Sequence, residues 1–315
     1  MRIPVNTLLY STTVCIWGST WYAITLQLSQ VPPMLSVIYR FALASVILFA
    51  ICLATGTRLK YSARDQFFLV LQGATWIGAG YYLLYIVSGK ITSGLIATMF
   101  SCILFLNVIN LRIFMGIPAR KGVLAAAALG IVGVVLAFQP APGAAGKAIG
   151  IVPYLIATVS VYLSSIGNVI ALRNARTGMS PFASNAWSML YGSLLLIVLW
   201  VAQGGSFQFS TDWGYLLPLL YLSLFGSVTA FCCYLKLMDN IGADRAAYAL
   251  IMAPVLALVI STIFEGFQWS GVRLLGACCV FLGNILVLAP EHVLKRVWGM
   301  VSGARRLART PTPRS

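Results

Sequence analysis

Long apolar runs follow one another along the chain and are separated by short polar segments. Each run approaches the roughly 20 residues that an α-helix needs to cross about 30 Å of hydrocarbon. The alternation of apolar and polar positions that marks a half-buried strand is absent, so a closed barrel is not expected. The pattern predicts ten membrane-spanning helices, over residues 6–27, 33–54, 67–88, 93–115, 122–139, 149–172, 182–202, 214–237, 246–264 and 272–290.

The composition of the chain agrees with a lipid environment. The 315 residues are 60% hydrophobic and 9% charged, with a mean hydropathy of +0.92. Soluble domains carry about 25% charged residues, so a soluble fold of this composition would have too little polar surface to cover itself. The sequence therefore predicts an all-α integral membrane protein.

The net charge of +15 indicates the topology of the chain. Counted from a cytoplasmic N-terminus, most of the 21 Lys and Arg residues fall in alternate loops and in the segment 291–315, whereas the intervening loops carry Lys90, Lys147 and Arg273. Because basic residues gather on the cytoplasmic side of membrane proteins, both termini are expected in the cytoplasm. Residues 291–315 then form a basic tail beside anionic lipid, and no nucleic-acid partner is expected.

The cysteine and histidine residues point to neither a metal site nor a cofactor. The seven cysteines fall inside predicted helices, and the single histidine, His292, lies in the tail, so no metal-ligand spacing arises. Nor is the first helix a secretory signal, because no small-residue cleavage site follows it. We expect no metal and no cofactor.

The second half of the chain repeats the first. Residues 93–140 align without a gap with residues 243–290, and the shared positions include the terminal Pro140 and Pro290. A five-helix unit has an odd number of crossings, so its second copy must enter the membrane from the opposite side. Inverted repeats are typical of secondary transporters that bind substrate near the midplane. The predicted domains are repeats 1–140 and 149–290, the linker 141–148 and the tail 291–315.

Aromatic and hydroxyl side chains lie near the middle of several predicted helices. Tryptophans of the interfacial belt lie at helix ends, whereas Trp17, in "CIWGSTWYAI", lies at a helix centre, where the wall of a cavity explains it better. Packing between helices, with the indole or phenol bonded to a neighbour, is the alternative for each residue. The predicted substrate-binding residues are Trp17, Thr20, Trp21, Tyr81, Tyr82, Tyr85, Tyr162, Ser165 and Tyr248.

Other intramembrane polar residues favour structural roles. Asn107 and Asn110 fit interhelical hydrogen bonding. Arg40 could attract a carboxylate, but reaching the interface or capping carbonyl groups is the favoured interpretation. The small-residue stretches "AAAALGIVG" and "GACCVFLG" indicate internal helix packing, with a dimer contact as the alternative, so a monomer is expected.

Enzyme and channel functions find no support in the sequence. The acidic residues lie in loops or at helix ends, no nucleophile–base pair or metal constellation is present, and no charged ring or filter-like loop is visible. The central parts of the predicted helices lack Asp, Glu and His, so facilitated transport without proton coupling is predicted. Glu265, near the outer end of a helix, is the one reservation.

Three stretches resemble a known family: "WGSTWYA", "PPMLSVIYRFALAS" and the segment from "FGSVTAFCCYLKLMDNIGADRAAY" to "GNILVL". The chain resembles the drug/metabolite transporter superfamily, specifically EamA-type ten-helix transporters, and is most similar to bacterial amino-acid exporters of the YddG type. The resemblance implies a bacterial inner-membrane location and export of amino acids, aromatic ones included. Multidrug or other metabolite export and proton-coupled transport are the alternatives. The repeats depart from each other at Leu104 against Pro254 and Met115 against Glu265.

Overall fold

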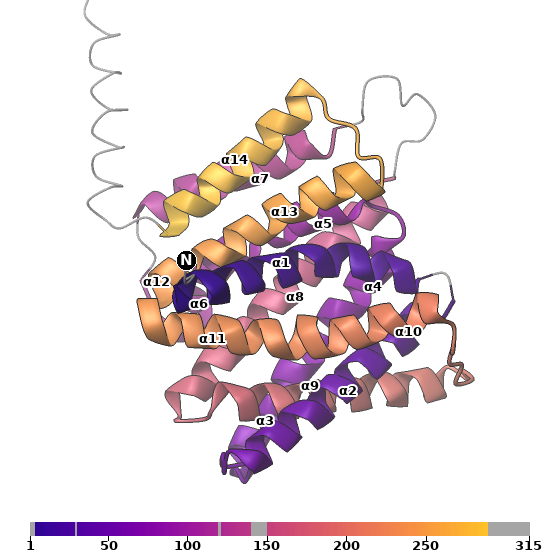
Figure 1. Ribbon diagram of the computed structural model, residues 1–315. Coiled ribbons are helices and arrows are strands. Elements are labelled where there is room, and N and C mark those ends of the chain that lie inside the picture. Colours follow the sequence, from indigo (N-terminus) through magenta and orange to yellow (C-terminus); the bar gives the residue numbers. More distant parts are fainter. Residues whose placement is uncertain (1–3, 29, 119–120, 140–149, 289–315) are drawn as a thin grey trace, which may run out of the picture.

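The computed structural model describes residues 4–28, 30–118, 121–139 and 150–288 (Figure 1). Within these ranges the regular structure is helical and no strand occurs. This confirms the predicted all-helical class. The predicted linker 141–148 and tail 291–315 lie outside the described residues.

Helices follow one another through both halves of the chain. The first half contains α1 (Val5–Gln27), α2 (Pro33–Ala54), α3 (Ala63–Gln72), η1 (Gly73–Tyr81), α4 (Tyr82–Ser88), α5 (Ser93–Phe100), α6 (Ile103–Met115) and α7 (Lys121–Ala137). The second half contains α8 (Ile151–Arg176), α9 (Pro181–Ala202), α10 (Trp213–Leu220), η2 (Tyr221–Thr229), α11 (Ala230–Ile241), α12 (Ala243–Ala246), α13 (Tyr248–Phe264) and α14 (Gly271–Leu288). The segments η1 and η2 are π-helical and continue the α-helices on either side of them.

Each of the ten predicted ranges contains helix. Among the described residues, seven helical stretches are long and apolar enough to cross a membrane, while α7 contributes a shorter apolar part, Ala125–Ala137, and α13 is also shorter. The helix α1 has 23 residues but is not among the seven. A multi-pass membrane protein is therefore evident, and the number of ten crossings stays a prediction.

The same signals delimit corresponding helices in the two halves. Pro33 and Pro181 stand at the first positions of α2 and α9, where a missing N–H and a fixed φ are compatible with a helix start. Gly116 and Gly266 follow α6 and α13 with φ of +66° and +64°. Glycine adopts this left-handed conformation without the strain of a Cβ.

Contacts between helices recur when the two halves are exchanged. The helix α1 packs against α13, as α8 packs against α6; likewise α2 packs against η2, as α9 packs against η1. At one edge of the molecule α7 packs along α14 (Figure 1, top). A Cβ at Gly133 would lie 2.6 Å from the carbonyl oxygen of Gly276, so the small-residue faces pack internally, as predicted.

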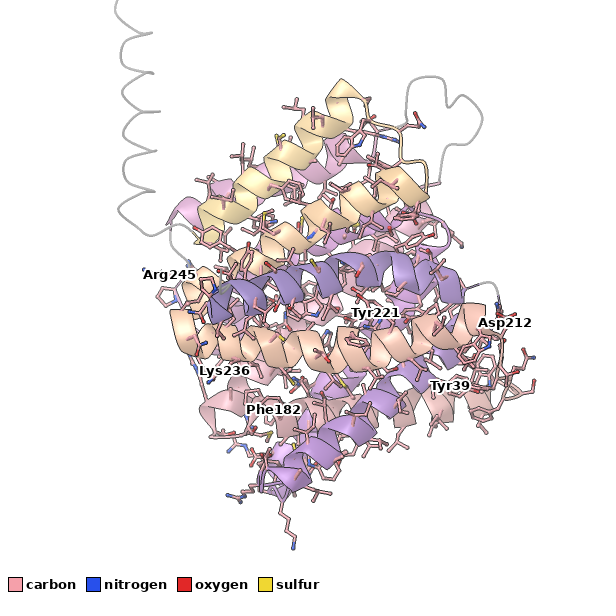
Figure 2. The ribbon with its side chains drawn as sticks, viewed as in Figure 1. Tyr39, Phe182, Asp212, Tyr221, Lys236 and Arg245 are labelled. Atoms are coloured by element: carbon pink, nitrogen blue, oxygen red, sulfur yellow. The ribbon has the colours of Figure 1, made fainter. Side chains whose placement is uncertain are left out.

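The two ends of the helices differ in their charged residues. Lys236 and Arg245 lie at the left end in Figure 2, which also holds the start of α1 in Figure 1, whereas Asp212 and Tyr39 lie at the right. We call these the basic end and the opposite end. The predicted topology makes the basic end cytoplasmic.

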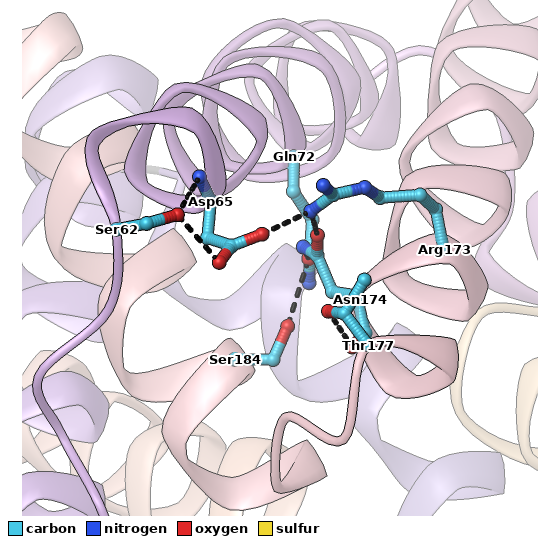
Figure 3. Close-up of polar contacts among 7 residues, drawn as sticks. All are labelled: Ser62, Asp65, Gln72, Arg173, Asn174, Thr177 and Ser184. Carbon is cyan, nitrogen blue, oxygen red and sulfur yellow. Dashed lines mark hydrogen bonds and ion pairs between the residues drawn. The ribbon is translucent and has the colours of Figure 1, made fainter.

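A polar cluster joins α3, α8 and α9 (Figure 3). Arg173 Nη1 lies 2.8 Å from Asp65 Oδ1, and both side chains are about one-fifth exposed. Deeper in the bundle, Gln72 Oε1 accepts hydrogen bonds from Asn174 Nδ2 at 2.8 Å and Ser184 Oγ at 2.9 Å. The Gln72 part of the cluster is buried, so its hydrogen bonds have no water to replace them.

Candidate functional site

A cavity of about 290 Å³ lies between the two halves of the chain. Its walls are mostly aromatic and aliphatic, with a few hydroxyl, amide and guanidinium groups. The first half contributes Trp17, Thr20, Trp21, Arg40, Trp76, Tyr81, Ala97, Phe100, Ser101, Ile103, Leu104 and Asn107. The second half contributes Asn168, Gly226, Phe231, Tyr234, Leu250, Ala253 and Pro254.

The helix α1 presents its tryptophans to this cavity. Trp17 Nε1 donates a hydrogen bond to the carbonyl oxygen of Gly226 on η2 at 3.2 Å, and its ring lies 5.2 Å from that of Tyr234. The Trp21 ring lies 5.1 Å from that of Phe100 on α5. Trp17 therefore combines both sequence-based interpretations, because it lines the cavity and also links two helices.

The π-helical segment η1 determines which aromatic residues of its helix reach the cavity. Trp76 and Tyr81 both line it. They are five residues apart, and π-helical hydrogen bonds join residues five apart, so both side chains lie on the same face. Of the three tyrosines predicted in this helix, Tyr81 lines the cavity, whereas Tyr82 and Tyr85 do not. Tyr82 is partly buried against the hydrophobic core outside the cavity lining.

The remaining predicted residues lie elsewhere. Tyr85 is fully buried behind the cavity wall, where its hydroxyl accepts from Arg40 and donates to Gln27. Ser165 is buried and accepts a hydrogen bond from Asn110 Nδ2 at 2.9 Å. Tyr162 and Tyr248 are 41% and 38% exposed and are not among the residues that line the cavity. Trp17, Thr20, Trp21 and Tyr81 are thus the predicted residues that the structure brings together, and a substrate contact by any of the nine stays a prediction.

The favoured interpretation of Arg40 was wrong. Its side chain is 2% exposed and lines the cavity, so it does not reach the interface. It donates from Nε to Ser227 Oγ at 3.2 Å and from Nη1 to Tyr85 Oη at 3.3 Å, so its partners are hydroxyls and not carbonyls. The rings of Phe41 and Tyr81 lie within 4.8 and 5.1 Å of the guanidinium carbon. The cation is held inside the bundle by neutral groups.

Three aromatic lining residues carry no signal in the sequence. Trp76, Phe100 and Tyr234 are aromatic residues in apolar helices, which the sequence does not distinguish from core residues. Asn107 and Asn168 face each other at 3.5 Å and line the cavity together. Within the described ranges, no group of three His, Cys, Asp or Glu side chains is placed to hold a metal ion.

At the opposite end, α5 and α13 close over the cavity. Glu265 Oε2 accepts from the backbone N–H of Ser93 at 2.9 Å and from Ser93 Oγ at 2.6 Å. One residue further, a Cβ at Gly94 would lie 2.8 Å from Leu258 Cα. The two helices therefore touch at backbone distance. The helix that follows α5, α6, packs against α8, whereas α5 packs against α13.

Toward the basic end a second hollow of about 200 Å³ continues the first. The two share Trp76, Asn168 and Phe231, and the second is also lined by Ala175 near the end of α8 and by Met179 in the following loop. The lining thus runs from the central cavity to the basic end. The contact between α5 and α13 lies at the opposite end, so the two ends of the cavity differ in structure.

Comparison with known proteins identifies the family. The model of the EamA-like transporter family matches residues 7–139 and again 151–289. The chain belongs to the EamA-like transporter family. The two matches correspond to the two halves described above, which confirms the two-repeat layout and the resemblance inferred from the sequence.

Curated relatives match over almost the whole chain. The uncharacterized inner membrane transporter YedA of Escherichia coli strain K12 is 25% identical over 88% of this chain and 89% of its own length. Protein PecM of Dickeya dadantii is 24% identical over 87% of this chain and 89% of its own length. The uncharacterized transporter YoaV of Bacillus subtilis is 25% identical, covering 88% and 96% of the two chains.

A solved crystal structure shares the fold, with a TM-score of 0.63 at 19% identity over 89% of this chain and 95% of the other. Family and relatives together confirm a multi-pass membrane transporter of the bacterial inner membrane. These matches identify neither the substrate, which we predicted to be amino acids, nor the mechanism of transport.

Proposed function

We propose that this EamA-family transporter exports small amphipathic metabolites, above all amino acids with apolar or aromatic side chains, by alternating access around the central cavity. The observation that carries the proposal is the cavity itself, about 290 Å³ in volume and lined from both repeats. Pockets for drug-sized ligands range from about 300 to 1,000 Å³. The volume here is at the lower limit of that range, which favours a small metabolite over a large drug.

The lining offers contacts for the ammonium group and for the apolar side chain of an amino acid. The rings of Trp17 and Trp21 line the cavity and can attract an ammonium group through their quadrupole. Pro254 has no N–H to donate to the carbonyl oxygen of Leu250, one turn earlier. Because both residues line the cavity, this carbonyl oxygen can accept a hydrogen bond from the ammonium group. An apolar side chain fits among the remaining aromatic residues.

The two ends of the cavity support alternating access. This proposal is supported by the packing of α5 against α13 toward the opposite end and by the second hollow on the side of the basic end. Exchange of these two arrangements would carry substrate between the ends. Because the helix contacts recur with the repeats exchanged, an equivalent closure at the basic end can be built from corresponding helices.

The described lining residues support uncoupled transport. They include no Asp, Glu or His, the residues that proton-coupled transporters commonly titrate. Glu265 lies outside the lining and is bonded to Ser93. A concentration gradient of an overaccumulated metabolite would then drive export.

The test is counterflow of radiolabelled leucine and phenylalanine in proteoliposomes, with and without an imposed pH gradient. We expect exchange that the pH gradient leaves unchanged. Trp17→Ala should lower the initial rate at least tenfold, because the substitution removes a wall of the cavity. Trp213→Ala is the matched control, since Trp213 is 69% exposed and lies outside the lining.

Counterflow absent for every amino acid but present for lipophilic cations would contradict the amino-acid assignment. Accumulation above equilibrium that a protonophore abolishes would contradict the uncoupled mechanism. Equal loss in both tryptophan variants would mean that Trp17 acts through folding alone.

A further inference from the structure

Arg40 stands alone as a charged residue in the cavity wall. The other described lining residues are neutral. It projects from α2, is 2% exposed, and lies beside the aromatic residues of α1 and η1. A guanidinium group stays protonated in proteins, so the cavity permanently contains one positive charge.

The donors of Arg40 are only partly used. A guanidinium carries five N–H donors and no acceptor. Nε donates to Ser227 and Nη1 donates to Tyr85. Among the hydrogen bonds of the described residues, the remaining N–H groups have no partner.

Among the described residues, no acidic side chain forms an ion pair with Arg40. The one ion pair within the described ranges joins Arg173 to Asp65, in the polar cluster of Figure 3. The rings of Phe41 and Tyr81 attract the guanidinium, but a buried cation without an anion remains unfavourable. An anionic ligand would remove that penalty.

Nη2 of Arg40 lies beside Gly226, and both residues line the cavity. A Cβ at Gly226 would lie 3.5 Å from Arg40 Nη2 and 2.8 Å from Thr20 Cγ2. A larger residue than glycine would therefore crowd Thr20 and Nη2 at this point of the cavity wall. A carboxylate placed here would meet the planar edge of the guanidinium, which binds carboxylates through two parallel hydrogen bonds.

We propose that Arg40 binds the carboxylate of the substrate, and that the transporter therefore selects molecules with one carboxylate over their neutral or cationic analogues. This inference rests on transport through the central cavity, as proposed above. A phosphate monoester carries close to two negative charges at neutral pH, and the described lining holds no second cation to balance it. The ammonium group of an amino acid has no acidic partner there, so it is tolerated but not required.

A purely structural role for Arg40 makes a different prediction. Its hydrogen bonds tie α2 to η2 and α4. Loss of a structural tie lowers stability whatever ligand is present, whereas loss of a carboxylate site changes the preference between ligands. The preference is therefore the quantity to measure.

The experiment compares acids with their amides as ligands of the purified protein in detergent. The probes are leucine and leucinamide, phenylalanine and phenylalaninamide, and phenylacetate, and the readout is the concentration that gives half-maximal thermal stabilisation. For the wild type, each amino acid should act at a concentration at least tenfold lower than its amide. Arg40→Gln should raise the value for the acids at least tenfold and bring the acid-to-amide ratio near one.

Three variants separate charge from packing. Arg40→Lys keeps the cation and should keep the preference for acids. Tyr85→Phe and Ser227→Ala remove one hydroxyl partner each and leave the guanidinium in place, so they should also keep the preference. Should Arg40→Gln fail to fold, the wild-type comparison remains a test, because equal binding of acids and amides there would overturn the carboxylate site.

The outcomes separate this inference from the proposed function. Amides that bind as well as acids, or a preference that survives in Arg40→Gln, would overturn the carboxylate site while leaving amino-acid transport intact. Arg40-dependent binding of phenylacetate without binding of amino acids would support the carboxylate site and overturn the amino-acid assignment. No binding by any acid would overturn both.

Discussion

Glu265 should hold the opposite end of the cavity closed. Its carboxylate reaches from the end of α13 to the first residue of α5, where Ser93 donates from both its backbone nitrogen and its hydroxyl. The N-cap residue of α5, Thr92, makes no side-chain capping bond. Glu265 therefore caps a helix of the other repeat, and this cap exists only while α5 and α13 are together.

The size of the effect follows from these contacts. An N-cap contributes about 0.5–2 kcal/mol, and a negative charge at a helix N-terminus about 0.3–1 kcal/mol. Because Glu265 is only partly buried, the sum is about 1–3 kcal/mol and not the full value of a buried charged pair. Since about 1.4 kcal/mol is a tenfold change in an equilibrium constant, Glu265→Ala should open this end between about five- and a hundredfold more often.

Accessibility of the cavity provides the assay. A cysteine introduced at Ala97, a buried lining residue, would be alkylated by a membrane-impermeant maleimide added from the opposite end. The parent protein would lack the seven native cysteines. We expect faster alkylation in Glu265→Ala and an intermediate rate in Glu265→Gln, which keeps the shape of the side chain without its charge.

Asp212→Asn is the matched control. Asp212 caps α10 at the same end by accepting from the backbone of Gly214, but this bond stays within one segment. It should lower thermal stability without changing the alkylation rate. Equal rates in Glu265→Ala and the parent would refute the reasoning, because Glu265 would then cap α5 without affecting the opening of the cavity.

Two further predictions concern stability, measured as the melting temperature and monodisperse yield in detergent. Gly133→Val should destabilise the protein by about 1–3 kcal/mol because it overpacks the contact between α7 and α14; Gly271→Val, where a Cβ meets nothing within 4 Å, should change little, and equal losses would contradict the packing argument. Gln72→Leu should cost more than Asp65→Asn, because it leaves buried donors without partners, at about 1–3 kcal/mol each, whereas the Asp65–Arg173 pair is partly exposed and ion pairs near the surface contribute about 0–1 kcal/mol. The reverse order would contradict the assignment of Gln72 to the buried part of the cluster.

The positions of the helices could be predicted because the signals for them are local. The length of each apolar run, the prolines at helix starts and the glycines at helix ends all lie within the segments that they delimit. The residues of α1 at the cavity could also be predicted, since α1 is a regular helix and Trp17, Thr20 and Trp21 follow its 3.6-residue period.

The helix that contains η1 shows where such reasoning stops. Its π-helical hydrogen bonds change the period within one continuous apolar run, so Trp76 replaces Tyr82 at the cavity. Close packing is a physical reason for glycine in this segment, since a Cβ at Gly73 would collide with the backbone of Ser188 on α9. That contact joins two repeats, and nothing within the segment itself reveals it.

The role of Arg40 could not be predicted from its own segment either, because it depends on contacts with other helices. Counted from Pro33 and Pro181, the first residues of α2 and α9, the position of Arg40 corresponds to Ser188. Ser188 accepts from Gln72 Nε2 at 3.3 Å, and the other end of the Gln72 amide is filled by Asn174 and Ser184. In the second repeat, Ser188 thus belongs to a group of neutral side chains in which both ends of the Gln72 amide are hydrogen-bonded. At the corresponding position of the first repeat, Arg40 is a cation with N–H donors that are not used. Neutral side chains are thus sufficient to join the helices at this position, and helix packing alone does not require an arginine. The repeats are alike where they pack, and they differ where one of them presents a charge to the cavity.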